Sequence, residues 1–387
     1  MRCKALQRPP KRRSALPVSI RDVAREAGVS VATVSRAFST PETVAPVTRE
    51  RVLAVAAALR YAPNRAARGL ITGRTGNVGV IVPDLANPYF QAVLAGAQGR
   101  ARQADYAVFV ADSGESATEE AALITAMGKQ VDGIVLCSSR LAEPALRALE
   151  PEPAVVLLNR RVPGRASVLI DSADGMHQAV THLAALGHRH CVFVAGPRRS
   201  WSNRQRLKGL RAAAREHGLV VETVGPVAPR FEGGAHAAEA VLATGAGAVL
   251  AYNDLVALGI LSRLSALGVA VPAQVSVVGF DDIPVAAMVT PALTTVALPT
   301  AQAGEAAVDL LLAALSGTPP AQGPRAVPGD DGGPGPASAP RTLPASAART
   351  LPASAPRTLP ASAPRTLPAH LVVRASTAAP GASRDRL

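Results

Sequence analysis

Cysteine, aromatic side chains and long apolar runs are all scarce in this chain of 387 residues, of which only 3% are aromatic. Its three cysteines, Cys3, Cys137 and Cys191, are too few and too scattered for a disulfide framework or a metal cluster. No apolar run reaches the length of a membrane span, and no uninterrupted apolar segment follows the basic N-terminus as in a secretory signal. We therefore expect a cytoplasmic protein without a membrane partner, in which Cys137 and Cys191 are buried free thiols.

Motifs that mark enzymes are missing as well. The chain contains no Walker loop, and no Gly-x-Gly-x-x-Gly or Gly-x-Ser-x-Gly motif in the strand–turn–helix context that such motifs need. His182, His188, His190 and Cys191 lie close together in the sequence, but we do not expect a metal site there. The sequence thus predicts no catalytic residue, metal or cofactor, and it argues against an enzyme.

Positive charge is concentrated at the two ends of the chain. Residues 1–76 carry fifteen Lys or Arg against four Asp or Glu, and residues 318–387 carry eight against three. The segment between them is slightly acidic, although the whole chain has a net charge of +13. The length predicts two or three domains. A basic N-terminal module on a slightly acidic body is typical of a protein that binds a polyanion such as DNA with one domain.

Residues 18–62 show the pattern of a helix-turn-helix. Apolar residues recur at i, i+3, i+4 and i+7, the spacing of one helix face: Ile20, Val23, Ala24 and Ala27. Gly28 and Val29 are predicted to turn the chain, and the hydroxyl of Ser30 is placed to cap a second helix.

The second helix is predicted to turn Val34, Ala37 and Phe38 toward the first. Five residues are left facing outward: Val31, Ala32, Thr33, Ser35 and Arg36. Hydroxyls and an arginine on this face favour a recognition helix in the DNA major groove over a simple pair of packed helices. A third helix is predicted over Thr48–Leu59, with Pro46 near its start and five residues inward: Val52, Leu53, Val55, Ala56 and Leu59.

From Asn77 onward, short apolar runs alternate with alanine-rich helical segments. The predicted strands are 78–82, 107–111, 133–136, 154–158, 191–195, 248–251 and 275–279. The predicted helices are 88–104, 116–129, 174–187, 203–217, 233–243 and 254–267. Continuous apolar strands between helices indicate parallel sheets covered on both faces, and this number of units predicts two doubly wound subdomains. Ligands of such sheets bind at the carboxyl ends of the strands.

Residues 337–368 are four tandem copies of Ala-Ser-Ala-Pro-Arg-Thr-Leu-Pro, with Ala348 in place of one proline. So much proline excludes a regular ladder, so we expect a surface loop, after which 365–374 forms a last strand. The expected organisation is a disordered basic arm (1–17), a headpiece (18–62), a hinge (63–76), a core (77–317 and 366–378), the repeat loop (318–365) and a disordered tail (379–387).

The segment Ile20–Arg36, IRDVAREAGVSVATVSR, resembles the headpiece of the lactose- and galactose-repressor (LacI/GalR) family almost without departure. Core phrases at 82–90, 253–259 and 277–283 resemble the periplasmic-binding-protein fold that this family joins to its headpiece. The resemblance covers residues 18–317 and 366–378. It implies an all-α helix-turn-helix headpiece followed by an α/β core of two doubly wound parallel-sheet subdomains.

The resemblance also implies a transcriptional regulator that binds double-stranded operator DNA as a homodimer. We favour a repressor whose operator affinity is controlled by a small-molecule effector, a sugar or sugar derivative, bound between the core subdomains. An activator, or a global regulator that responds to a phosphoprotein or to a nucleoside or purine, remains open on the sequence alone.

By the same resemblance, Val31, Ala32 and Arg36 read base edges. Arginine can pair with guanine through two hydrogen bonds, whereas valine and alanine offer only apolar contacts. Four residues match phosphate-contacting positions, which set the register on DNA: Ser30, Thr33, Ser35 and Tyr61. In a hinge helix of barely two turns the matching residues are Asn64, Ala67 and Leu70, with Leu70 as the minor-groove wedge. One departure is Ala45, where the family usually has a capping serine.

The family's effector-contacting positions are matched by Asn159, Arg206, Asn253 and Asp281, and Tyr89, Phe90 and Trp201 are candidates for aromatic walls. Amide, guanidinium and carboxylate groups suit adjacent hydroxyls, each of which both donates and accepts hydrogen bonds. The alternatives are a helix cap for Asn253, a tight turn for Asp281 and a surface role for Arg206. Two departures, Asn159 in place of the commoner aspartate and Leu298 in place of a glutamine, weaken any inference about which sugar binds.

Overall fold

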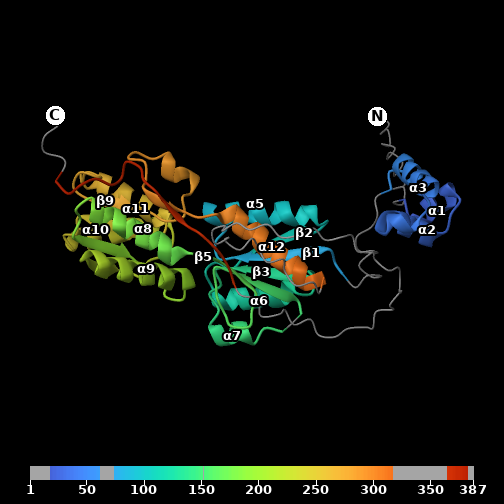
Figure 1. The fold of residues 1–387 in the computed structure, drawn as a ribbon, viewed down its shortest axis with the longest axis horizontal. Coiled ribbons are helices and arrows are strands. Elements are labelled where there is room, and N and C mark those ends of the chain that lie inside the picture. The colour runs from blue at the N-terminus through green and yellow to red at the C-terminus, as the bar shows by residue number, and fades with distance from the viewer. Residues whose placement is uncertain (1–17, 62–73, 151, 317–363, 382–387) are drawn as a thin grey trace, which may run out of the picture. The chain divides into compact units, whose positions relative to one another are not determined.

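A computed structural model of the chain describes residues 18–61, 74–150, 152–316 and 364–381. The chain divides into two compact units, Met1–Thr75 and Gly76–Leu387, which are described separately (Figure 1). The predicted basic arm, the hinge residues Asn64, Ala67 and Leu70, and the repeats up to residue 363 lie outside the described residues. The predictions about them stay predictions.

In its described residues, the first unit contains three helices, α1 (Ile20–Ala27), α2 (Val31–Ser39) and α3 (Pro46–Ala58), and one 3-10 turn at Pro41–Thr43. Their packed faces form a small core of Val23, Ala24, Ala27, Val34, Ala37, Val52 and Ala56. The inward faces predicted for the first two helices agree with this core. One prediction was wrong, because Leu53 is 36% exposed. It follows the buried Val52 and is therefore turned by about 100° around the helix, away from the packed face.

The second unit contains two parallel sheets. The first has the strand order β11-β5-β4-β3-β1-β2. Its strands are β1 (Asn77–Val82), β2 (Ala107–Asp112), β3 (Gly133–Cys137), β4 (Ala154–Leu158), β5 (Ser167–Ile170) and β11 (Arg365–Leu367). Helices α5 (Pro88–Gln103) and α12 (Thr300–Ser316) cover one face of this sheet, and α6 (Ala117–Met127) and α7 (Glu143–Arg147) cover the other (Figure 1).

Strand residues of the first sheet alternate between these two helical layers. Val80 and Val82 belong to the core on the side of α5 and α12, whereas Ile81 packs with residues of α6 and α7. Helices α5 and α12 touch at Gly96, where a Cβ atom would lie 2.0 Å from the carbonyl oxygen of Ala301. Only glycine permits this close approach of the two backbones.

The second sheet has the order β7-β6-β8-β9. Its strands are β6 (His190–Val194), β7 (Val220–Val224), β8 (Ala248–Ala251) and β9 (Ser276–Val278). Its helices are α8 (Ser172–Ala185), α9 (Trp201–His217), α10 (Phe231–Ala243) and α11 (Asp254–Ala266), in two packed pairs, α8 with α9 and α10 with α11. The predicted arrangement of two doubly wound parallel sheets is therefore confirmed, and Cys137 and Cys191 are buried free thiols as expected.

In the described residues, the chain crosses from one half of the core to the other after β5, before α12, and between β11 and β12 (His370–Val372). Strand β12 pairs antiparallel with β10 (Thr295–Ala297) rather than with either parallel sheet. The prediction of one last strand over 365–374 was therefore wrong. Pro368 and Ala369 separate two strands in different sheets, because proline has no N–H to continue a ladder. No helix in the described part of the chain combines the length and apolar composition needed to span a membrane.

Candidate functional site

The turn between α1 and α2 is built as the sequence predicted. Gly28 ends α1 in the left-handed conformation, with φ of 64°, which glycine adopts without strain. Ser30 then caps α2, because its hydroxyl accepts a hydrogen bond of 3.1 Å from the backbone N–H of Thr33. The two caps fix where α1 ends and α2 begins, so they set which residues of α2 face outward.

The outward face of α2 carries the predicted recognition residues. Val31 is 42% exposed, and Ala32 and Arg36 are also exposed. Thr33 and Ser35 are half-buried, and the hydroxyl of Thr33 lies 2.9 Å from that of Ser30. No acidic residue stands in the first turn of α2, so the positive end of this helix is available to a phosphate.

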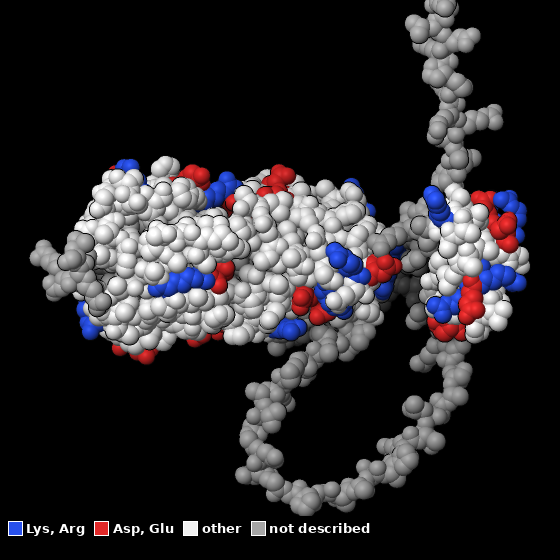
Figure 2. All heavy atoms as spheres, turned by 90° about the horizontal axis from the view of Figure 1, so that it is seen from above, with Lys and Arg blue, Asp and Glu red and all other residues white. Residues whose placement is uncertain are grey.

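Tyr61 lies beyond α3 at the end of the described headpiece. It is half-buried, and its ring packs edge-on against Phe38 with 6.1 Å between the ring centroids. The third helix begins without a side-chain cap, because Ala45 occupies the cap position and has no hydroxyl. The visible face of the headpiece shows Lys and Arg mixed with Asp and Glu rather than one uniform charge (Figure 2).

A narrow cleft lies at the carboxyl ends of the strands of both sheets of the second unit. Its volume is about 30 Å³, and it is lined by Asp84, Asn87, Tyr89, Phe90, Glu115, Ser138, Arg140, Asn159, Ser202, Arg206, Pro229, Tyr252, Asn253 and Asp281. Six of the seven residues singled out from the sequence are therefore brought together. Trp201 begins α9 half-buried and is not among the lining residues.

Tyr89, Phe90 and Asn159 form the wall from the first sheet. The side-chain amide of Asn159 donates a hydrogen bond of 2.7 Å to the hydroxyl of Tyr89 and accepts one of 3.1 Å from the N–H of Ile170. Burial, reinforced by the charge of Asp281, raises the pKa of Tyr89 well above its usual value. The hydroxyl therefore keeps its proton and remains able to donate to a ligand. The rings of Tyr89 and Phe90 lie edge to face, 4.9 Å apart.

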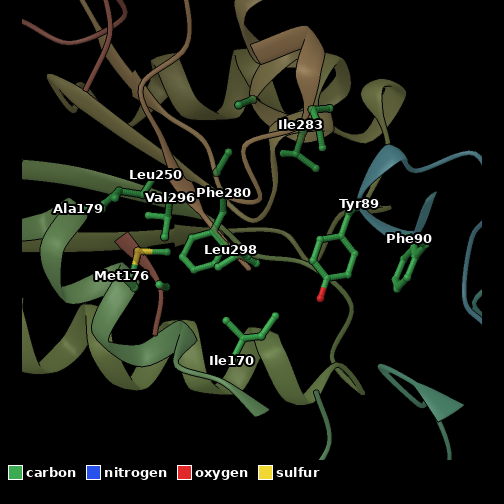
Figure 3. Close-up of a cluster of buried hydrophobic side chains, with 14 of the residues drawn as sticks. Tyr89, Phe90, Ile170, Met176, Ala179, Leu250, Phe280, Ile283, Val296 and Leu298 are labelled. Atoms are coloured by element: carbon green, nitrogen blue, oxygen red, sulfur yellow. The ribbon is translucent and has the colours of Figure 1, made fainter. Parts of the chain in front are cut away.

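Arg206 is the centre of the wall from the second sheet. Its guanidinium stacks on Phe280 and Tyr252, 3.8 and 4.7 Å from the ring centroids. It also donates to the carbonyl of Tyr252 and, over 3.1 Å, to the carboxylate of Asp281, while its Nε has no hydrogen-bond partner among the described residues. Figure 3 shows Tyr89 and Phe280 in one buried cluster that also contains Leu298. The surface role considered for Arg206 is therefore wrong, because this side chain is only 5% exposed.

Asp281 has a strained backbone conformation, and both ends of the Asn253 side-chain amide are hydrogen-bonded. Asp281 has φ of 119°, and such strain is found mainly at functional sites. Burial raises the pKa of Asp281 to about 7, although Arg206 opposes the shift. Asn253 does cap α11, because its Oδ1 accepts from Val256 over 2.9 Å, and its Nδ2 donates to the carbonyl of Pro229 over 3.0 Å.

Two ion pairs of the cleft were not foreseen. Arg140 binds the carboxylate of Glu115 through two nitrogens, and Arg230 donates over 2.8 Å to Asp84. Arg230 stands just before α10, whereas Asp84 follows β1, so this pair joins the two halves of the cleft. The segments after the strands were predicted as the binding edge, but nothing in the sequence identifies which charged residues pair there.

The histidines that lie near one another in the sequence have separate partners. His182 contacts the hydroxyl of Thr377, His188 that of Ser276, and His190 the carboxylate of Glu222. In the described residues, no three His, Cys, Asp or Glu side chains are placed to hold a metal ion.

Comparison with known proteins agrees with both units. Residues 19–64 match the model of bacterial regulatory proteins of the lacI family, and residues 180–330 match a periplasmic binding protein-like domain. The regulator GalS of Salmonella typhimurium is 35% identical over 78% of this chain and 91% of its own. Catabolite control protein A of Priestia megaterium is 34% identical over 76% and 91%, and the repressor CytR of Escherichia coli is 32% identical over 77% and 90%.

Solved structures show the same architecture. The lac repressor dimer bound to operator and the anti-inducer ONPF matches with a TM-score of 0.73 and 27% identity, over 94% of this chain and all of that one. A complex of the regulator CelR with cellobiose matches with a TM-score of 0.62 and 27% identity, over 93% and 99%. A helix-turn-helix unit and a two-sheet core of this kind define a DNA-binding transcriptional regulator. The chain belongs to the LacI family of bacterial regulatory proteins.

Proposed function

We propose that this regulator is a repressor whose operator affinity is set by a small effector, a sugar or sugar derivative, bound in the cleft between the two core sheets. The observation that carries the proposal is the cleft itself. Amide, guanidinium, carboxylate and aromatic groups from both sheets converge on it in a chain that also carries a recognition helix. Such convergent polar groups between aromatic walls suit a polyhydroxylated ligand.

In the headpiece, Val31, Ala32 and Arg36 are proposed to contact base edges, because they are the exposed residues at the start and middle of α2. Ser30, Thr33, Ser35 and Tyr61 are proposed to contact phosphates. The roles proposed for Asn64, Ala67 and Leu70 rest on the sequence resemblance alone.

In the core, a ligand requires the cleft to widen. Ligand pockets usually measure about 300–1,000 Å³, whereas this cleft measures about 30 Å³. Widening must separate Arg230 from Asp84, since these two side chains come from opposite halves. Effector binding is therefore coupled to the relative position of the two core subdomains, and by linkage the operator and the effector alter each other's affinity.

We further propose that the chain acts as a homodimer on a near-palindromic operator in the cytoplasm. Apolar side chains are exposed on the core unit, among them Phe109 on the edge strand β2 (40%) and Met288 (74%). A surface cavity of about 620 Å³ is also lined largely by apolar residues, including Phe231, Leu258 and Leu261.

The test is a fluorescence-anisotropy titration with the DNA upstream of the protein's own gene, with salt and a panel of sugars, nucleosides and purines as variables. We expect tight, salt-dependent binding that one sugar weakens. A ligand that strengthens binding would give the opposite sign of coupling, and a response only to a nucleoside or purine would replace the sugar. Absence of specific DNA binding at any salt concentration would refute the proposal.

A further inference from the structure

The strand β11 is made by the last of the four tandem repeats. Its residues Arg365–Leu367 belong to the copy at 361–368, Ala-Ser-Ala-Pro-Arg-Thr-Leu-Pro. The strand runs parallel to β5, with Leu367 opposite Ile170, and the carbonyl of Leu367 accepts a hydrogen bond of 2.9 Å from the N–H of Asp171. One repeat unit therefore supplies a strand of the first sheet.

Two side chains of the segment 365–369 are buried. Leu367 is 8% exposed and Ala369 is 4% exposed, and both belong to the main core of the second unit. The carbonyl of Ala369 also accepts a hydrogen bond of 3.2 Å from the side-chain amide of Gln178. The other residues of the segment are exposed: Arg365, Thr366 and Pro368. The position beside β5 thus selects an extended backbone, one leucine and, two residues later, one small side chain.

Three other segments of the chain carry the same residues. The sequence Arg-Thr-Leu-Pro-Ala occurs at 365–369 and also at 341–345, 349–353 and 357–361. The buried leucine and alanine, and the residues whose backbone pairs with β5, are therefore identical in every copy and equally spaced. The register of a strand is weakly specified when several registers offer the same side chains to the core.

The surroundings of β11 favour an exchange of one copy for another. In the described residues β11 pairs only with β5, at the edge of the sheet, so exchange breaks a single ladder. The copy at 357–361 would leave eight residues as a loop before His370, and this loop can emerge into solvent because His370 is exposed. Closing such a loop disfavours the new register on the order of twentyfold, since closure probability falls with about the 3/2 power of loop length.

We propose that the edge of β5 is a binding site for the segment Arg-Thr-Leu-Pro-Ala, and that the three upstream copies compete with 365–369 to occupy it. Exchange by one copy lengthens the connection to β12 from two residues, Pro368 and Ala369, to the ten residues 360–369. This connection is one of three crossings between the halves of the core in the described chain. An upstream copy in the site therefore loosens one of the links between the two halves.

The first experiment compares the melting temperatures of the full-length protein and of a chain that lacks the three upstream copies, residues 337–360. The deletion alone should change little, because loop-closure entropy depends only weakly on length. In the shortened chain, Leu367→Asp should lower the melting temperature by about 10 °C or prevent folding, because a charge replaces a buried leucine. In the full-length protein the same substitution should cost less than half as much, because an upstream leucine takes the position.

Leu371→Asp is the matched control. Leu371 lies on β12 and packs against the same core, but outside the repeats. This substitution should destabilise the two chains equally. An equal loss for Leu367→Asp in both chains would overturn the proposal. A rescue that grows with protein concentration would also overturn it, because the copy would then come from a second molecule.

Trypsin cleavage followed by mass spectrometry identifies the copy in the site, because each copy contains one Arg–Thr bond, after Arg341, Arg349, Arg357 or Arg365. In the wild type we expect the bond after Arg365, which lies in β11, to be cleaved most slowly of the four. In full-length Leu367→Asp the slowest bond should be the one after Arg357, whose copy needs the shortest loop. A bond after Arg365 that stays the slowest in this variant would show that no exchange occurs.

Discussion

The ion pair between Arg230 and Asp84 is predicted to hold the cleft closed when no effector is bound. It joins charged side chains of the two core halves, with 2.8 Å between Nε of Arg230 and Oδ2 of Asp84. The Asp84 side chain is 5% exposed and that of Arg230 is 49% exposed. Solvent therefore screens the pair from one side, and we expect a coupling of about 1 kcal/mol, at the upper end for exposed pairs. This changes the ratio of open to closed molecules by about fivefold.

The assay is a distance distribution between labels on the two halves. Glu119→Cys on α6 and Lys208→Cys on α9 provide exposed attachment sites, while the native Cys137 and Cys191 are buried and do not compete. Cys3 is replaced by serine. Arg230→Gln is expected to move the distribution toward longer distances at low salt, and 1 M salt is expected to do the same to the wild type.

Two further variants make the reasoning refutable. Asp84→Asn should open the cleft as Arg230→Gln does, and the double variant should open it no further, because both remove one interaction. Arg263→Gln is the control, since it removes an ion pair with Glu239 that lies within the second half. A distribution that Arg230→Gln leaves unchanged, or effects of the two single variants that add, would show that the pair does not hold the cleft closed.

Three other predictions follow from single residues. Arg36→Ala should weaken specific operator binding by about tenfold or more, the value of one bidentate base contact, and change binding to unrelated DNA much less, as measured by anisotropy. Ala45→Ser should stabilise the headpiece by about 1 kcal/mol in thermal unfolding, because it supplies the cap that α3 lacks; an unchanged melting temperature would contradict this. Burial raises the pKa of Asp281 to about 7, from about 3.9 in the unfolded chain. The native state therefore keeps a proton that the unfolded chain loses, so this contribution to stability is full below about pH 4 and is lost as the pH rises to 7. Asp281→Asn should flatten the stability profile over that range, and an unchanged profile would refute the assignment.

The headpiece was predictable because its information is local. The spacing from Ile20 to Ala27, the glycine at 28 and the serine at 30 each act within one or two helical turns, and the structure places them as expected. Leu53 was assigned to the wrong face for the same local reason. Helix α3 has more apolar residues than one face can hold, and the choice among them depends on where α1 and α2 pack.

The parallel sheets were predictable from their continuous apolar strands, with exceptions. Strand β5 was not predicted, although it is buried between β4 and β11. Strand β7 lies at a sheet edge and contains Glu222 and Thr223, so its sequence does not read as a buried strand. The single strand predicted around Pro368 failed because the two halves of that segment pair with different sheets. Edge position and choice of sheet are set by long-range packing, which composition within a window does not contain.

In the candidate cleft, too, local features were predictable from the sequence and long-range pairings were not. Asn159, Arg206, Asn253 and Asp281 were found by their match to the family's effector-contacting positions. Asn159, Asn253 and Asp281 also follow strands at the carboxyl edge, where parallel sheets place ligands. Whether a charge there is neutralised depends instead on residues far away in sequence, as with Arg230 and Asp84, which are separated by 146 positions. The lining residues of the cleft were therefore predictable from the sequence, whereas the pairing of its charges was not.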